Sequence, residues 1–146
     1  MSRGEARFND GAMQQPPRVH EFMTTMPQTI DLRSTLARAI QIMAERSVRH
    51  LPVVNDGSLV GLVSERDIAV CEALGKDPDL VEVEAIMRRR VFTCGPQAHL
   101  HAVAEEMATH KYGSAVVVEL ERPVKVVGVF TTVDALRALA VYTKES

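Results

Sequence analysis

The chain has 146 residues, of which 46% are hydrophobic and 25% are charged, so it is long enough to bury the core of an ordinary globular unit. Its formal net charge of -2 gives no global field that favours nucleic acid or an anionic membrane. We expect neither as a partner, and any phosphate binding must be local. Cys71 and Cys94 lie far apart without a C-x-x-C motif, which argues against a zinc site and a disulfide framework.

The first residues form a polar segment that contains glycine and proline but no apolar run. They include Gly4, Gly11, Pro16 and Pro17. This pattern is neither that of a signal peptide nor that of a membrane span. We therefore expect residues 1–18 to be a flexible N-terminal tail and the protein to be cytoplasmic.

The rest of the chain repeats itself. The apolar positions of the first predicted helix follow i, i+3, i+4, i+7 spacing, which places them on one buried stripe, with Ser34 as the candidate N-cap. The same stripe recurs 64 residues later. The two sets are Leu36, Ala39, Ile40 and Met43, and Leu100, Val103, Ala104 and Met107. Self-similarity of this length indicates a duplicated structural unit.

After this helix each half contains two strands and a second helix. In the first half a strand at 51–54 leads through turn residues 55–57 to a strand at 59–63, and a helix runs from near Asp67 to Gly75. The second half has a strand at 114–118, a hairpin connection at 119–125 that includes Pro123, and a helix at 134–142.

The predicted order is therefore β-α-β-β-α, written twice, which places the chain in the α/β (α+β) class. Repeats of about 60 residues are small for independent cores, so we expect the halves to pack their sheets together about a pseudo-two-fold axis. The predicted boundaries are a first repeat at 19–74, a linker at 75–82, a second repeat at 83–142 and a C-terminal tail at 143–146.

The pattern Gly-x-x-[Ser/Thr]-x-x-Asp occurs where the last strand of each repeat gives way to a helix. It consists of Gly61, Ser64 and Asp67 in the first repeat and Gly128, Thr131 and Asp134 in the second. A helix N-terminus presents unpaired N–H groups and a partial positive charge, which suit a phosphate. A carboxylate can accept two hydrogen bonds from a ribose diol. The alternative is that Ser64 and Thr131 are only N-caps and that the aspartates only oppose the helix dipole.

Two copies of this motif in a matched repeat resemble tandem CBS-domain proteins, the paired arrangement called a Bateman module. The resemblance is carried by Val-His-Glu-Phe-Met-Thr at 19–24, Arg-His-Leu-Pro-Val-Val at 49–54 and Gly-Leu-Val-Ser-Glu-Arg-Asp-Ile at 61–68. The second repeat departs further from the family. Arg88 replaces the opening Thr, and Lys-Tyr-Gly-Ser-Ala at 111–115 stands where Arg-His-Leu-Pro would be.

The resemblance implies two clefts between the repeats that bind adenosine derivatives, with Asp67 and Asp134 on the ribose. The other implied ligand-binding residues are Ser64, Thr131 and Thr132 at the phosphates together with Arg49, His50 and Arg66, then Thr29, Ile30, Phe92 and Thr93 at the adenine, and Tyr112, Gly113 and Ser114 in the second cleft.

The two implied clefts differ in charge. Arg49, His50 and Arg66 are expected in the first cleft, whereas the second, around Tyr112, Gly113 and Thr131, is expected to be more neutral. The positive charge of the first repeat favours AMP, ADP or ATP over S-adenosylmethionine.

Other patterns carry no predicted site. Arg88-Arg89-Arg90 is interpreted as a solvated charge run, with contact to a phosphate or an acidic partner as the alternative. Cys71 is interpreted as a residue of the packed core. His99 and His101 are two residues apart and lack the helical spacing of a metal pair. No Ser-His-Asp spacing, Walker loop or carboxylate pair indicates catalysis, so we expect neither an enzyme nor an obligatory cofactor.

Two functions remain open. The first is a regulatory sensor, in which an adenine nucleotide enters a cleft and biases a regulated protein in trans. The second is a structural homodimerisation module whose clefts stay empty. The resemblance implies flat, disc-like homodimers, with the apolar faces of the helices near 67–74 and 134–142 as the interface. A small enzyme or DNA-binding protein is less supported, because a catalytic cluster and a helix-turn-helix pattern are missing.

Overall fold

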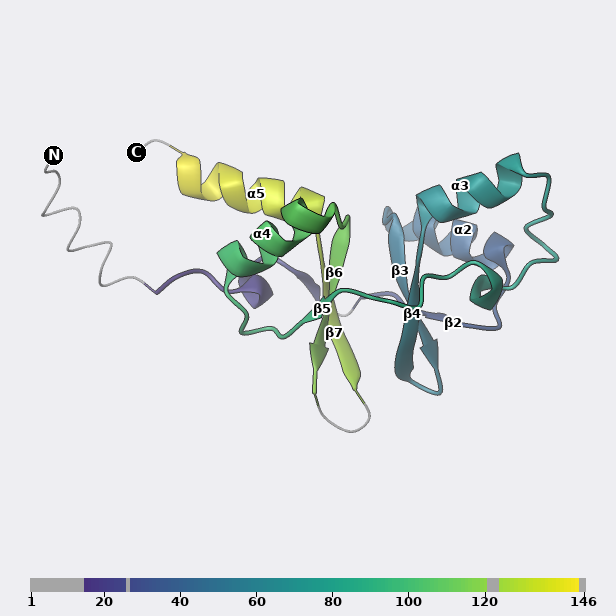
Figure 1. The fold of residues 1–146 in the computed structure, drawn as a ribbon, viewed down its shortest axis with the longest axis horizontal. Helices are drawn as coiled ribbons and strands as arrows, with labels where there is room; N and C mark the ends of the chain where they lie inside the picture. Colours follow the sequence, from purple (N-terminus) through teal and green to yellow (C-terminus); the bar gives the residue numbers. More distant parts are fainter. Residues whose placement is uncertain (1–14, 26, 121–123, 145–146) are drawn as a thin grey trace, which may run out of the picture.

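The computed structural model describes residues 15–25, 27–120 and 124–144. Two halves lie side by side, each with a small sheet and two helices on its outer side (Figure 1). The first half contains β2 (Ile30–Asp31), α2 (Leu36–Arg46), β3 (His50–Asn55), β4 (Ser58–Ser64) and α3 (Glu65–Ala73). The second half contains β5 (Thr93–Cys94), α4 (Leu100–His110), β6 (Ser114–Glu119), β7 (Lys125–Thr131) and α5 (Thr132–Thr143). The predicted β-α-β-β-α order and the mixed α/β class are confirmed.

Helix α2 differs from its prediction at its cap and at one core position. The N-cap is Thr35, whose hydroxyl accepts a hydrogen bond from the Arg38 N–H at 3.2 Å, and not Ser34, which is held in the preceding turn. The predicted core residues Leu36, Ala39 and Met43 are buried. Ile42 is buried with them, whereas Ile40 is 37% exposed. The helix is therefore rotated slightly from the predicted orientation, and Ile40 lies at the edge of the buried stripe.

The turn between β3 and β4 has the geometry that its sequence predicts. Asp56 and Gly57 have φ angles of 52° and 82°, the paired positive values of a tight two-residue hairpin turn. In the second half, Glu119 pairs with Lys125 across the corresponding hairpin. Residues 121–123, which include the predicted turn residue Pro123, lie outside the described residues.

The opening segment of each repeat joins the sheet of the other repeat. Strand β1 (Thr24–Thr25) pairs antiparallel with β7, so the second sheet has the order β1-β7-β6-β5. The first sheet has the order β2-β3-β4, and its strand β4 is bridged at Leu62 by Arg88, with hydrogen bonds of 2.8 and 2.9 Å. Arg88 lies 64 residues after Thr24, so the exchange is reciprocal.

The same exchange completes both hydrophobic cores. The 3-10 helix η1 (Val19–Glu21) places the fully buried Val19 in the core of the second half. The 3-10 helix η2 (Val83–Ala85) places the fully buried Val83 in the core of the first. Because burial of a valine side chain contributes about 1.5–3 kcal/mol, each half depends on the opening segment of the other repeat.

Two segments outside the halves hold the first turns of α2 and α4. The Pro17 carbonyl accepts the Leu100 N–H, and the Val81 carbonyl accepts the Leu36 N–H, both at 2.9 Å. Residue 17 belongs to the expected tail and residue 81 to the expected linker. Both therefore satisfy backbone donors that a helix N-terminus leaves without a partner.

The motif glycines admit the exchanged segments at close range. A Cβ on Gly61 would lie 2.6 Å from the Met87 sulfur and 2.9 Å from the Arg88 carbonyl oxygen. A Cβ on Gly128 would lie 3.0 Å from the Thr24 carbonyl oxygen. At both positions a methionine sulfur, of Met87 or Met23, and a backbone carbonyl of the other repeat approach this closely, which requires a residue without a side chain.

We expect Gly61→Ala to lower the free energy of unfolding by about 1–3 kcal/mol, because the added methyl group overpacks a contact with backbone. The matched control is Gly95→Ala, since a Cβ on Gly95 meets nothing within 4 Å. Urea unfolding followed by circular dichroism measures both variants. Equal stability of the two would show that the close approach at Gly61 is unimportant.

Candidate functional site

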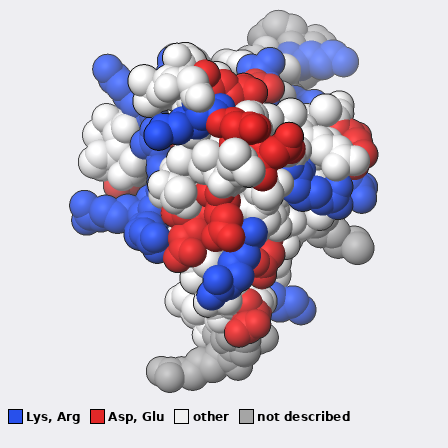
Figure 2. Space-filling model, turned by 90° about the vertical axis from the view of Figure 1, so that its right-hand side faces the viewer, with Lys and Arg blue, Asp and Glu red and all other residues white. Residues whose placement is uncertain are grey.

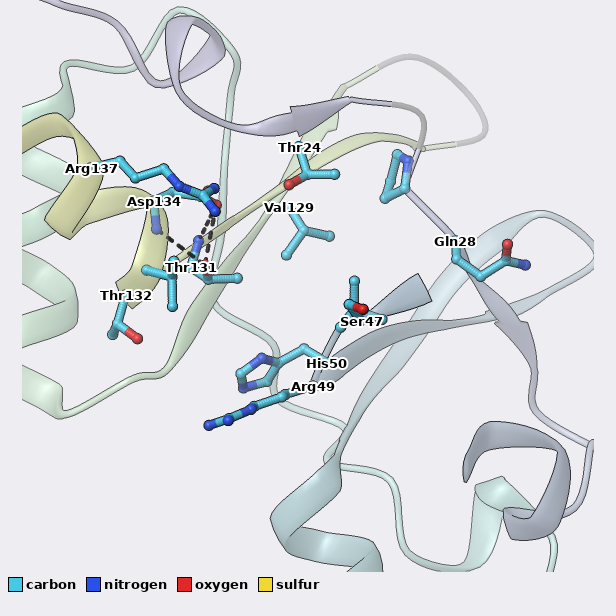
Figure 3. Close-up of a pocket in the computed structure, with 13 residues that line it drawn as sticks. Thr24, Gln28, Ser47, Arg49, His50, Val129, Thr131, Thr132, Asp134 and Arg137 are labelled. Carbon is cyan, nitrogen blue, oxygen red and sulfur yellow. Dashed lines mark hydrogen bonds and ion pairs between the residues drawn. The ribbon is translucent and has the colours of Figure 1, made fainter. Parts of the chain in front are cut away.

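A pocket of about 480 Å³ lies at the junction between the two halves (Figure 3). Its volume is in the range of small-molecule sites. The lining residues come from both halves and are Thr24, Pro27, Gln28, Ser47, Val48, Arg49, His50, Val129, Thr131, Thr132, Val133, Asp134 and Arg137. The pocket thus lies between the motif residues Thr131 and Asp134 of the second half and the residues at the start of β3 in the first half.

Thr131 and Asp134 form the first turn of α5 as a capping box. The Thr131 N–H donates to Asp134 Oδ2 at 2.9 Å, and the Asp134 N–H donates to Thr131 Oγ1 at 3.3 Å. The helix therefore begins at Thr132, before the predicted start, and the N-cap interpretation of Thr131 is confirmed. Asp134 is 3% exposed, and Arg137 Nη1 donates to its Oδ1 at 3.4 Å. The cap holds the carboxylate in a fixed position at the pocket wall.

Arg49 and His50 reach the pocket from the start of β3 and point toward Thr131 and Thr132 (Figure 3). The Arg49 side chain is 82% exposed, and its Nε lies 3.7 Å from Glu65 Oε1. An exposed pair of this kind contributes about 0–1 kcal/mol. The Arg49 guanidinium can therefore turn toward an anion in the pocket at small cost.

His50 is half-buried beside these charges. Burial lowers the pKa of His50 from its ordinary value of 6.5, while Asp67 and Glu65 oppose the shift and Arg49 adds to it. The imidazole is therefore neutral at pH 7. An anion bound next to it would favour the protonated form and raise this pKa.

This arrangement corrects the predicted division of charge between the clefts. The sequence places Arg49 and His50 with Asp67, but they line the pocket of Asp134. The reason is the pseudo-two-fold packing of β4 against β7, which brings the start of β3 opposite the helix that follows β7. The cleft around Thr131, expected to be the more neutral one, is therefore the one that contains the Arg49 guanidinium and the His50 imidazole.

Asp67 has different partners. Ser64 caps α3 by accepting the Asp67 N–H at 3.1 Å, so α3 begins at Glu65 and the N-cap interpretation of Ser64 is confirmed. Arg88 donates to both carboxylate oxygens of Asp67, from Nε at 3.3 Å and from Nη2 at 3.2 Å. Burial alone would raise the pKa of Asp67, but hydrogen bonds from Arg88 and Ser64 outweigh it and hold the pKa below its usual value. Arg88 is 66% exposed but pairs with an acidic side chain, so the alternative to a purely solvated charge run holds for this residue.

Five predicted site residues line the pocket, and the other ten are not among its lining residues. Those in the lining are Arg49, His50, Thr131, Thr132 and Asp134. Those elsewhere are Ser64, Arg66, Asp67, Thr29, Ile30, Phe92, Thr93, Tyr112, Gly113 and Ser114. Ile30 is 4% exposed in the first core, and Phe92 stacks on Tyr112 with ring centroids 5.1 Å apart. The buried Ser114 hydroxyl has no hydrogen-bond partner among the described residues.

Eight lining residues were missed by sequence reasoning, and four of them are polar, namely Thr24, Gln28, Ser47 and Arg137. Thr24 and Arg88 occupy equivalent positions of the repeat, which shows that the two clefts differ at this point. Arg137 follows Asp134 by three residues, a spacing that places both on one face of a helix. Both signals are present in the sequence.

The two cysteines are free thiols, one buried and one partly buried. Burial raises the pKa of the Cys94 thiol to about 11, so it is protonated at neutral pH and a poor nucleophile. Cys71 is 8% exposed in the first core, as expected of packing material. Within residues 15–25, 27–120 and 124–144, no three His, Cys, Asp or Glu side chains are grouped as metal ligands.

A family model described as CBS domain matches the chain twice, at residues 19–71 and 83–141. The chain belongs to the CBS-domain family. The CBS-domain pair of protein MJ0100, solved in complex with 5'-methylthioadenosine and S-adenosyl-L-methionine, aligns with a TM-score of 0.80 and 28% identity, covering 88% of this chain and 100% of that one. The pair of repeats is therefore a known structural unit.

Two curated relatives place the repeats in different surroundings. A homoserine O-acetyltransferase of Methanohalobium evestigatum is 31% identical over 83% of this chain, which spans only 24% of that protein. The CBS domain-containing protein YhcV of Bacillus subtilis is 31% identical over 64% of this chain and 66% of its own length. The chain thus spans about a quarter of the acetyltransferases it matches.

The lowered pKa of His50 predicts a pH-dependent stability. Because the unfolded chain binds a proton at a higher pH than the folded chain, the contribution of neutral His50 is present above pH 6.5 and is lost as the pH falls below it. When the pH is lowered from 8 to about 5.5, the free energy of unfolding should fall less for His50→Asn than for the wild type. Urea unfolding across this range measures the difference, and parallel curves for the two proteins would contradict it.

Proposed function

We propose that this CBS-domain pair is a regulatory sensor of adenine nucleotides, with AMP, ADP or ATP as the ligand, in the pocket between its halves. One observation carries the proposal: a buried carboxylate at a helix N-terminus, Asp134, shares a pocket with Arg49 and His50 from the other half. A ribose needs an acceptor such as a carboxylate, whereas phosphates need N–H donors and cations. The pocket supplies both kinds of group.

The lining suggests how such a ligand would lie. Asp134 Oδ2 accepts from Thr131, whereas Oδ1 has only the long contact with Arg137, whose side chain is 72% exposed. If Arg137 turns to the phosphates, Oδ1 becomes available to a ribose hydroxyl. The apolar lining by Pro27, Val48, Val129 and Val133 suits the faces of the adenine ring.

Charge favours a phosphorylated ligand over S-adenosylmethionine. MJ0100, 28% identical to this chain, was solved with two adenosyl compounds, which supports the adenosine part of the proposal. The sulfonium of S-adenosylmethionine is positive, and the pocket already contains the guanidinium groups of Arg49 and Arg137. Like charges in a partly buried site oppose binding, whereas phosphate oxygens match both arginines.

A ligand in this position would contact both halves and so bias their relative arrangement. Thr132 and Asp134 belong to α5, whereas His50 begins β3 and Arg49 directly precedes it. A ligand shifts a conformational equilibrium only through its different affinity for the two states. We propose that the state favoured by nucleotide is read by a regulated protein.

Surface charge supports a protein partner rather than nucleic acid. On the face formed by the first half, Asp and Glu side chains gather in the middle, with Lys and Arg around them (Figure 2). Nucleic-acid binding favours a continuous basic surface.

In the described ranges no helix is long and apolar enough to cross a membrane.

We expect ATP, ADP or AMP to raise the Tm in proportion to the logarithm of ligand excess. Asp134→Asn keeps an amide oxygen for the Thr131 cap but removes the charge, so it should weaken binding about 10- to 100-fold. Asp56→Asn, at the exposed hairpin turn, is the matched control and should bind as the wild type does. Titration calorimetry measures the affinities. No heat and no Tm shift with any of the three nucleotides at millimolar concentration would refute the sensor.

A second function, homodimerisation with empty clefts, is supported by two exposed apolar helix faces. Helices α3 and α5 lie along the same side of the molecule (Figure 1). Large apolar side chains on them, or at the C-cap of α3, are more than half exposed, namely Val70, Leu74, Val133, Leu136, Leu139, Val141 and Tyr142. Apolar faces of this kind mark protein interfaces. The dimer is compatible with the sensor, and nucleotide titration separates the two functions.

We expect light scattering to give a mass of twice 16.1 kDa for the wild type. Leu136→Glu places a charge in the apolar face of α5 and should yield a monomer, because an unpaired charge is costly to bury in an interface. Leu80→Glu is the matched control, since Leu80 is 80% exposed on the linker segment. A wild-type monomer would remove this interface.

A further inference from the structure

The two clefts are related by the internal repeat, yet their aspartates have different neighbours. Asp67 is paired with Arg88 through both carboxylate oxygens, at 3.2 and 3.3 Å. Thr24, which occupies the Arg88 position of the other repeat, lines the open pocket of Asp134. A single position in the exchanged segments therefore separates a paired carboxylate from one that faces a pocket.

The backbone of Arg88 is fixed in place, so its side chain starts beside Asp67. Arg88 N–H and C=O are hydrogen-bonded to Leu62 at 2.8 and 2.9 Å, and the preceding Met87 is buried against Gly61. The Asp67 carboxylate is 15% exposed, whereas the Arg88 side chain is 66% exposed. The guanidinium thus lies over the carboxylate on the solvent side, and its fork matches both oxygens.

Two aromatic side chains stand at repeat positions equivalent to residues that line the open pocket. The Phe92 and Tyr112 rings stack with centroids 5.1 Å apart and an interplanar angle of 27°. The His110 ring also stacks on Tyr112, with centroids 5.2 Å apart. Phe92 and Tyr112 are equivalent by the 64-residue repeat to Gln28 and Val48, which line the open pocket. Residues that would border a ligand in this cleft contact each other instead.

We infer that Arg88 determines which cleft takes nucleotide, because its guanidinium occupies the Asp67 carboxylate that a ribose would need. The chain then binds one nucleotide, in the pocket of Asp134, because the Asp67 carboxylate is already paired with Arg88. This inference rests on the proposed function for the chemical class of the ligand. A tethered cation is present at every ligand concentration, so it competes with the ribose hydroxyls without having to diffuse to the site.

The test is Arg88→Thr, which gives the closed cleft the residue that stands in the open one. Native mass spectrometry and titration calorimetry with ATP and AMP count the nucleotides per chain. We expect one for the wild type and two for Arg88→Thr. Arg90→Thr, which removes a neighbouring exposed arginine, is the matched control and should keep one. The double variant Asp67→Asn with Arg88→Thr should return to one, because the ribose acceptor is lost.

Each outcome distinguishes this inference from the proposed function. Two nucleotides on the wild type would overturn the role of Arg88 and leave the sensor intact. No nucleotide on the wild type but one on Arg88→Thr would support the role of Arg88 and remove the proposed site at Asp134. An unchanged count in Arg88→Thr overturns the inference. If this variant is unfolded by circular dichroism, Arg88→Gln, which keeps most of the aliphatic stem, takes its place with the same expected count.

Discussion

The reciprocal exchange of the opening segments is the constraint on which the rest of this structure depends. Val83 completes the core of the first half and Val19 that of the second, so the halves are held together by their own hydrophobic interiors. The exchange also requires a glycine in each motif strand, where backbone from the other repeat passes within contact distance. Because the exchanged segments end beside the motif aspartates, packing and ligand chemistry are determined by the same few residues.

In both repeats the Ser/Thr-x-x-Asp sequence is first a helix cap and only then a candidate ligand site. Ser64 and Thr131 each accept the backbone N–H of the aspartate that follows. Capping determines where the carboxylate lies, but it does not determine what the carboxylate binds. That depends on the residue delivered by the other repeat, which is a guanidinium at one aspartate and a threonine at the other. Two copies of one motif can therefore give two sites that differ in whether the carboxylate is available to a ligand.

Features that depend on residues close together in the sequence were predicted correctly. Features that depend on contacts between the two halves were predicted wrongly or not at all. The β-α-β-β-α order, the turn at Asp56 and the two helix caps follow from neighbouring residues. The cap at Thr35 was missed by one position, because Ser34 is an equally good capping residue by type. The pairing of Arg49 with the pocket of Asp134 could not be predicted, since it depends on how β4 packs against β7.

The exchanged segments also affect the order in which the chain can fold during synthesis. The core of the first half lacks Val83 and Met87 until those residues have left the ribosome, although every other member of that core has already emerged. The second half has no such delay, because Val19 is made long before α4. Domains often fold in the order of synthesis. Here the earlier half must wait for the start of the later one, so neither half has its whole core until part of the other repeat has been made.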